Sequence, residues 1–112
     1  MIIEHVLLPV RPDRAAEFEA AFARARLIIE SMPGFRTLSL SRGVETPGTY
    51  LLLVEWNTLG DHVDGFRGSP EYEKWSRLLH HFYDPFPTVR HFEPVLASGV
   101  PPAVAASVPE AQ

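Results

Sequence analysis

The chain has 112 residues, of which 46% are hydrophobic, and a formal net charge of -4. A chain of this length forms one domain and can bury a core without a metal or a disulfide. Acidic and basic residues are mixed along the sequence, so it lacks a basic footprint and we expect no nucleic-acid partner. The absence of cysteine excludes thiolate catalysis and thiolate metal sites.

The sequence also indicates where the protein works. No segment is long and apolar enough to cross a membrane, and the N-terminus lacks the pattern of a secretory signal. We therefore expect a cytoplasmic protein with no membrane partner.

The first part of the chain predicts a strand followed by a helix. Residues 2–10 are almost wholly apolar apart from Glu4 and His5, which is typical of a central strand covered on both faces. After a short turn, apolar residues recur at helical spacing over 14–32, and Pro33-Gly34 predicts the end of that helix.

The middle of the chain predicts a β-hairpin. Residues 35–42 alternate between apolar and polar side chains, and the turn 46–49 leads into the apolar run 50–56. A short helical piece is expected from His62 to Phe66.

Residues 69–87 predict one capped amphipathic helix. Ser69 can cap the first free amides, Pro70 suits the first helical position, and Pro85 and Pro87 cannot continue the helix. One broad sector of this helix gathers large apolar side chains at Tyr72, Trp75, Leu78, Leu79, Phe82 and Tyr83. A last strand is expected over 88–95.

The predicted order, βαββαβ, indicates a ferredoxin-like α+β fold with two helices on one side of a four-stranded antiparallel sheet. Residues 50–54 offer no polar side to water, so the sheet face without helices must be covered, and we expect a homodimer. The domain is predicted to span 1–96, with a flexible Pro/Ala-rich tail over 97–112.

Four short motifs carry a resemblance to a known family: Pro33-Gly34-Phe35, Glu55-Trp56, the segment 65–70 and the segment 91–95. With them, the chain resembles the antibiotic biosynthesis monooxygenase family of the dimeric α+β barrel superfamily, over about residues 2 to 96. The resemblance implies a dimer and a ligand pocket between sheet and helices. Members include cofactor-free oxygenases of quinol-type polyketides and heme-degrading enzymes, and neighbouring families include polyketide cyclases.

The chain departs from each of these functional patterns. The oxygenase pattern keeps its tryptophan at Trp56, but Leu52 replaces its asparagine, His62 its tyrosine and Ser76 its arginine. The heme-degrading pattern has an asparagine, a tryptophan and an axial histidine where this chain has Leu7, Phe66 and, approximately, Ser76. The cyclase pattern has a tyrosine and a histidine where this chain has Phe66 and Tyr72, so that pair is missing. The first-strand histidine of such proteins does match His5.

Three residues are the predicted catalytic group: His5, Trp56 and His62. By strand parity and by the resemblance, His5 and Trp56 are expected to face the pocket, and His62 occupies a functional position of the family. Either histidine could act as the base. The simpler structural alternatives are a hydrogen-bonded core residue for His5 and an exposed surface residue for His62.

The predicted substrate-binding residues are the apolar and aromatic side chains that could line a flat cavity, namely Leu7, Leu52, Phe66, Tyr72, Trp75 and Phe82. Core packing alone could also use them. His80 and His81 are adjacent and diverge on a helix, so we expect no metal site, and the sequence has no phosphate loop or other cofactor motif. His91 is expected to serve the dimer contact or strand pairing.

These residues support a cofactor-independent monooxygenase of a small hydroxylated aromatic or polyketide-like substrate, with quinol to quinone chemistry. Two alternatives remain open from the sequence: a non-catalytic dimeric binding protein for an apolar metabolite, and a non-oxidative cyclase or isomerase. Heme binding is a further, weaker alternative.

Overall fold

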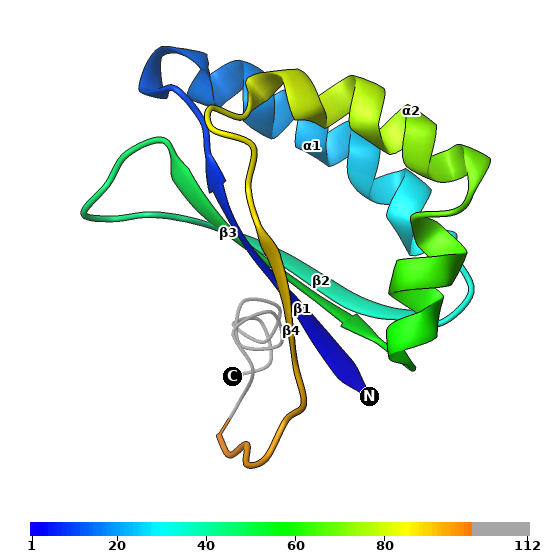
Figure 1. Ribbon diagram of the computed structural model, residues 1–112. Coiled ribbons are helices and arrows are strands. Elements are labelled where there is room, and N and C mark those ends of the chain that lie inside the picture. Colours follow the sequence, from blue (N-terminus) through cyan, green and yellow to red (C-terminus); the bar gives the residue numbers. More distant parts are fainter. Residues whose placement is uncertain (100–112) are drawn as a thin grey trace, which may run out of the picture.

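The computed structural model describes residues 1–99 and confirms the predicted ferredoxin-like α+β fold (Figure 1). The strands are β1 (Ile2–Pro9), β2 (Phe35–Arg42), β3 (Thr49–Trp56) and β4 (Val89–Phe92), and the two long helices are α1 (Ala15–Glu30) and α2 (Pro70–Leu79). They form one antiparallel sheet in the order β2-β3-β1-β4, and both helices cover the same face of it (Figure 1). The predicted tail, 97–112, lies almost wholly outside the described residues.

The register of the sheet decides which side chains share the helix-covered face. On β1 this face carries Glu4, Val6 and Leu8, which are all buried. Their partners across β3 are Val54, Leu52 and Tyr50, again all buried. Cross-strand partners point to the same side of a sheet, so the alternate residues of both strands point away from the helices.

Helix α1 supplies the other half of the core. Its buried side chains recur at helical spacing and pack on the sheet: Phe18, Ala21, Phe22, Ala25 and Ile29. None of the helices within residues 1–99 has the length and apolar character needed to cross a lipid bilayer.

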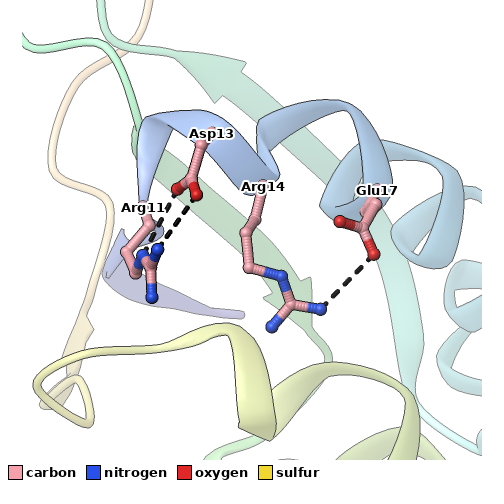
Figure 2. Close-up of polar contacts among 4 residues, drawn as sticks. All are labelled: Arg11, Asp13, Arg14 and Glu17. Atoms are coloured by element: carbon pink, nitrogen blue, oxygen red, sulfur yellow. Dashed lines mark hydrogen bonds and ion pairs between the residues drawn. The ribbon is translucent and has the colours of Figure 1, made fainter.

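Arginine side chains form ion pairs at the start of α1. A single 3₁₀ turn, η1 (Pro12–Arg14), precedes the helix, and Figure 2 shows Arg11 paired with Asp13 and Arg14 paired with Glu17. The Arg14 guanidinium also lies 4.5 Å from the centre of the Phe82 ring. This contact joins the start of α1 to the end of the second helical region.

The second helix is shorter than the sequence predicts. The Ser69 hydroxyl caps it as expected, accepting a 3.2 Å hydrogen bond from the Tyr72 amide. However, α2 ends at Leu79 and continues as a 3₁₀ turn, η3 (His80–Phe82). The ring of Pro85 would clash with the carbonyl four residues earlier, so a regular α-helix has to end before it.

A helical turn between β3 and α2, η2 (Asp61–Phe66), is held against the end of the sheet. Gly34, with a positive φ of 85°, passes so close to the Asp61 side chain that a Cβ at this position would collide with it. The Asp61 carboxylate accepts a 3.1 Å hydrogen bond from the Thr58 amide, and the Thr58 hydroxyl accepts one from the Asp61 amide. These contacts fix the start of η2 and therefore the position of His62.

Candidate functional site

A cavity of about 430 Å³ lies between the helix-covered face of the sheet and the second helical region. Its volume falls within the range of roughly 300–1,000 Å³ that is usual for small-molecule sites. Five of the predicted site residues stand in its wall: Leu52, His62, Phe66, Tyr72 and Trp75. The remaining lining residues are Glu4, Val6, Leu8, Arg67, His80, Tyr83, Phe86, Pro87 and Val89.

One end of the cavity is polar, and its central group is the carboxylate of Glu4. This side chain stands on β1 among apolar neighbours and is only 5% exposed. The indole N–H of Trp56 donates a 3.0 Å hydrogen bond to Glu4 Oε1. Glu4 Oε2 has no hydrogen-bond partner within residues 1–99, yet no buried side-chain polar atom there lacks one. Oε2 is therefore not sealed in the core, and it is free to meet a ligand in the cavity that Glu4 lines.

Two histidines extend this polar group into a chain. His62 Nε2 lies 3.3 Å from Glu4 Oε1, and His62 Nδ1 lies 2.8 Å from His91 Nε2. The position of His91 follows from register, because His91 on β4 is the direct cross-strand partner of Glu4 on β1. We call this arrangement the Glu4–His62–His91 chain.

Burial sets the protonation of the Glu4–His62–His91 chain. Desolvation raises the pKa of Glu4 to about 7, although the Trp56 hydrogen bond and the charge of Arg67 both lower it. Desolvation lowers the pKa of His62 to about 3, helped by the charges of Arg67 and His91. It also lowers the pKa of His91. At neutral pH His62 is therefore a neutral imidazole, and its 3.3 Å contact with Glu4 is not an ion pair.

The Glu4–His62–His91 chain has the geometry of a proton path or an orienting network rather than of a metal site. His62 directs one ring nitrogen toward Glu4 and the other toward His91, so the three groups do not converge on one point. Within residues 1–99 there is no group of three or more His, Cys, Asp or Glu side chains that could hold a metal ion.

Aromatic rings also wall the cavity. Ring centres follow one another at 5.2 Å from Phe66 to Tyr72, 5.7 Å from Tyr72 to His80 and 4.9 Å from His80 to Phe86. Tyr83 adds a further ring 6.0 Å from His80, and burial raises the pKa of its hydroxyl and lowers that of His80. Such a wall favours a flat aromatic ligand, because edge and face contacts between rings are attractive at these separations.

Trp56 stands behind the polar end instead of in the cavity wall. It is fully buried, and its ring stacks on His62 with ring centres 5.4 Å apart and 22° between the planes. Trp56 therefore fixes both the carboxylate of Glu4, through the hydrogen bond, and the imidazole of His62, through stacking.

The predicted placement of His5 and Leu7 is wrong. His5 pairs across the sheet with Leu53 and lies on the face away from the helices, where its ring meets Phe92 edge-on at 5.6 Å. Leu7 is on the same face and is 54% exposed. Both faces of β1 are apolar, so parity alone could not decide which of them the helices cover.

The predicted placement of Phe82 is also wrong. Its buried ring packs on Phe18 of α1 at 5.5 Å and beneath the Arg14 guanidinium, so it faces α1 and does not line the cavity. Because α2 gives way to a 3₁₀ turn at His80, the spacing of a continuous helix no longer applies at this position.

Four cavity residues carry chemistry that the sequence analysis did not assign: Glu4, Arg67, His80 and Tyr83. The signal for Glu4 was present, since it is a lone carboxylate within an apolar central strand. The role of His91 depended on the register of β4 against β1, which no tight turn fixes.

A heme site of the expected pattern does not fit these residues. Leu7, which holds the place of an asparagine in that pattern, points away from the cavity, and Ser76 has no side chain suited to bind iron.

Comparisons with known proteins agree with the architecture. A family model described as antibiotic biosynthesis monooxygenase matches residues 1–78. The uncharacterized protein YczJ of Bacillus subtilis is 53% identical over 95 residues, which cover 85% of this chain and all of YczJ.

Solved structures give the same result. A candidate antibiotic biosynthesis monooxygenase from Bordetella bronchiseptica superposes with a TM-score of 0.81 at 35% identity, covering 85% of this chain and 97% of that one. The heme-degrader MhuD of Mycobacterium tuberculosis, solved with two hemes in its active site, has a TM-score of 0.68 at 22% identity, covering 88% and 100% of the two chains. At that identity MhuD shows a shared fold alone.

Proposed function

Because the chain belongs to the antibiotic biosynthesis monooxygenase family, we propose that it is a cofactor-independent monooxygenase of a small hydroxylated aromatic or polyketide-like compound. One observation carries the proposal: a carboxylate with a pKa of about 7 stands at the polar end of an aromatic-walled cavity. A base whose pKa lies near the working pH is the best compromise between being deprotonated and accepting a proton well.

Glu4 is the proposed base, in place of the two histidines that the sequence suggested. His5 lies on the opposite face of the sheet, and the pKa of His62, about 3, makes it too weak a base near neutral pH. The Oε2 atom of Glu4 is the atom that would take the proton, because Oε1 already accepts from Trp56 and contacts His62.

The proposed reaction needs no electrons other than those of the substrate. Glu4 Oε2 removes the hydroxyl proton of the ring, and the resulting phenolate gives two electrons to dioxygen as a carbon–oxygen bond forms at the para carbon. Glu4 returns its proton to the peroxide. The para carbon then loses its C–H proton as the oxygen–oxygen bond breaks, which leaves a quinone and one water.

His62 and Trp56 are proposed to position the base. The neutral imidazole of His62 and the indole of Trp56 both lie against Oε1, and His91 fixes the far nitrogen of His62. A flat substrate packed against the aromatic rings of the cavity would displace water from the base, which strengthens interactions with the phenolate as it forms.

Oxygen uptake with 1-naphthol and a panel of dihydroxynaphthalenes tests the proposal. We expect uptake with formation of a naphthoquinone, and a loss of about a hundredfold or more in Glu4→Gln, which keeps the size of the side chain but cannot take a proton. His81→Asn is the matched control, because His81 is exposed and lies outside this cavity.

Two results would contradict the proposal in different ways. Tight binding of naphthols without oxygen uptake would favour a non-catalytic binding protein. Conversion that proceeds at the same rate without oxygen would favour a cyclase or isomerase.

We also propose a homodimer built on the sheet face that the helices leave uncovered. That face presents apolar side chains from three strands, including Leu7 at 54% and Phe92 at 50% exposure, together with Ile3, Leu51 and Leu53. A contiguous apolar face of this kind is rare on a monomer. Sedimentation at micromolar concentration should give the mass of two chains.

A further inference from the structure

We infer that the cavity selects an aromatic ligand that carries a carboxylate, and that Arg67 binds this group. The assignment of Arg67 rests on the proposed function for the location of the substrate. It goes further by stating the charge of that substrate.

Arg67 follows η2 directly, and its backbone amide donates a 3.1 Å hydrogen bond to the carbonyl of His62. This bond ties Arg67 to the turn that carries a member of the Glu4–His62–His91 chain. Among the described residues, it is the one arginine or lysine that lines the cavity.

The guanidinium of Arg67 is available to a ligand. Four other arginines pair with carboxylates, namely Arg11, Arg14, Arg26 and Arg42. Arg67 has no ion-pair or hydrogen-bond partner for its side chain within residues 1–99. Its five donors in a rigid fork match a carboxylate well.

The charge of Arg67 is felt throughout the polar end. Burial is the largest cause of the pKa shift of Glu4, of His62 and of His91, and the charge of Arg67 lowers all three pKa values. None of these three groups is itself positively charged at neutral pH. When Glu4 holds its proton, the polar end has a net positive charge, and an anionic ligand is favoured over a neutral one of the same shape.

The aromatic wall supplies the rest of the recognition. The rings from Phe66 through Tyr72 and His80 to Phe86 offer edges and faces to a flat ring system, but no second cation. A fused-ring carboxylate can therefore place its apolar body against these rings and its charge at Arg67.

Binding measured by calorimetry, without turnover, tests this assignment. The probes are 6-hydroxy-2-naphthoate and 6-hydroxy-2-naphthamide, at about pH 6 and low salt, under nitrogen. We expect the naphthoate to bind about tenfold more tightly, because a well-placed ion pair is lost with the amide. Arg67→Gln should abolish that preference without weakening the amide, and Arg67→Lys should keep part of it.

Arg77→Gln is the matched control, since Arg77 lies on the outer groove between α1 and α2. It should leave both affinities unchanged. Equal affinity of the unchanged protein for the two probes, or an unchanged preference in Arg67→Gln, would overturn the assignment. Rapid oxygen uptake with neutral naphthols, at the same rate in Arg67→Gln, would then leave the monooxygenase proposal standing while the charge preference fails.

Discussion

The carboxylate of Glu4 and the indole of Trp56 are joined by a buried 3.0 Å hydrogen bond between neighbouring strands of the sheet. Trp56 can only donate through its ring nitrogen, so Oε1 of Glu4 is always the acceptor. This bond fixes the direction of the carboxylate and leaves Oε2 to the cavity.

Glu4→Gln should change how stability depends on pH. The pKa of Glu4 in the folded protein, about 7, is raised above its ordinary value of 4.5. Its contribution to stability is therefore fully present below the ordinary pKa and is lost as the pH rises through about 7. From about pH 4 to 9, the unfolding free energy of the variant relative to the unchanged protein should rise by on the order of 3 kcal/mol.

Urea unfolding at several pH values measures this difference, and it isolates Glu4 because His62 titrates in both proteins. Glu73→Gln, on the exposed side of α2, is the control and should show a constant difference. A pH-independent difference for Glu4→Gln would mean that burial does not perturb this carboxyl.

Trp56→Phe should move the pH dependence of the reaction. The Trp56 hydrogen bond lowers the pKa of Glu4, so its loss raises that pKa and shifts the rise of activity to higher pH. The variant should also lose about 1 to 3 kcal/mol of stability, because a buried acceptor loses its donor. Phe35→Leu, next to Trp56 but without a bond to Glu4, should leave the pH profile in place.

The fold could be predicted from the sequence because each element is marked locally. The spacing of apolar residues located α1, and Pro33-Gly34 located its end. The alternation over 35–42 located β2 with the bounds that the structure has. The cap at Ser69 located the start of α2, where local chemistry alone decides the boundary.

The site could not be predicted in the same way, because it depends on which face of β1 meets the helices. Ile3 and Leu7 make one face of β1 apolar, and Val6 and Leu8 do the same for the other. From the sequence, either His5 or Glu4 could face the helices, and only the packing of α1 and α2 decides which of them does. His91 could not be paired with Glu4 until the register of β4 was known.

His91 should act as a positioning residue, and two substitutions can show this. His91→Phe removes the 2.8 Å contact to His62 and should lower kcat about tenfold with little change in KM. His91→Gln offers a side-chain amide in the same place and should restore most of the rate. If both variants lose activity only in proportion to lost folded protein, the role of His91 is structural.

Leu7→Asp should convert the proposed dimer to a monomer, because it places a charge on the uncovered sheet face, where Leu7 is 54% exposed. The matched control is Leu27→Asp on α1, where the leucine is 60% exposed on the helical side. Sedimentation should show dissociation in the first variant alone. A monomeric unchanged protein at micromolar concentration would rule out the dimer.

The protein should neither shift nor sharpen the Soret band of added hemin, since neither Leu7 nor Ser76 supplies what the heme-degrading pattern requires. Absorbance titration measures this directly. A sharp band that saturates at one hemin per chain would contradict the expectation.

The rate of oxygen uptake with 1-naphthol, measured from about pH 5 to 9 in the unchanged protein and in Glu4→Gln, tests the role of Glu4 most directly. The unchanged protein should gain activity as the pH rises through about 7, the pKa of this carboxyl, and the variant should lack both the rise and the activity. A folded Glu4→Gln variant that keeps the full rate and the same pH profile would contradict the assignment of Glu4 as the base.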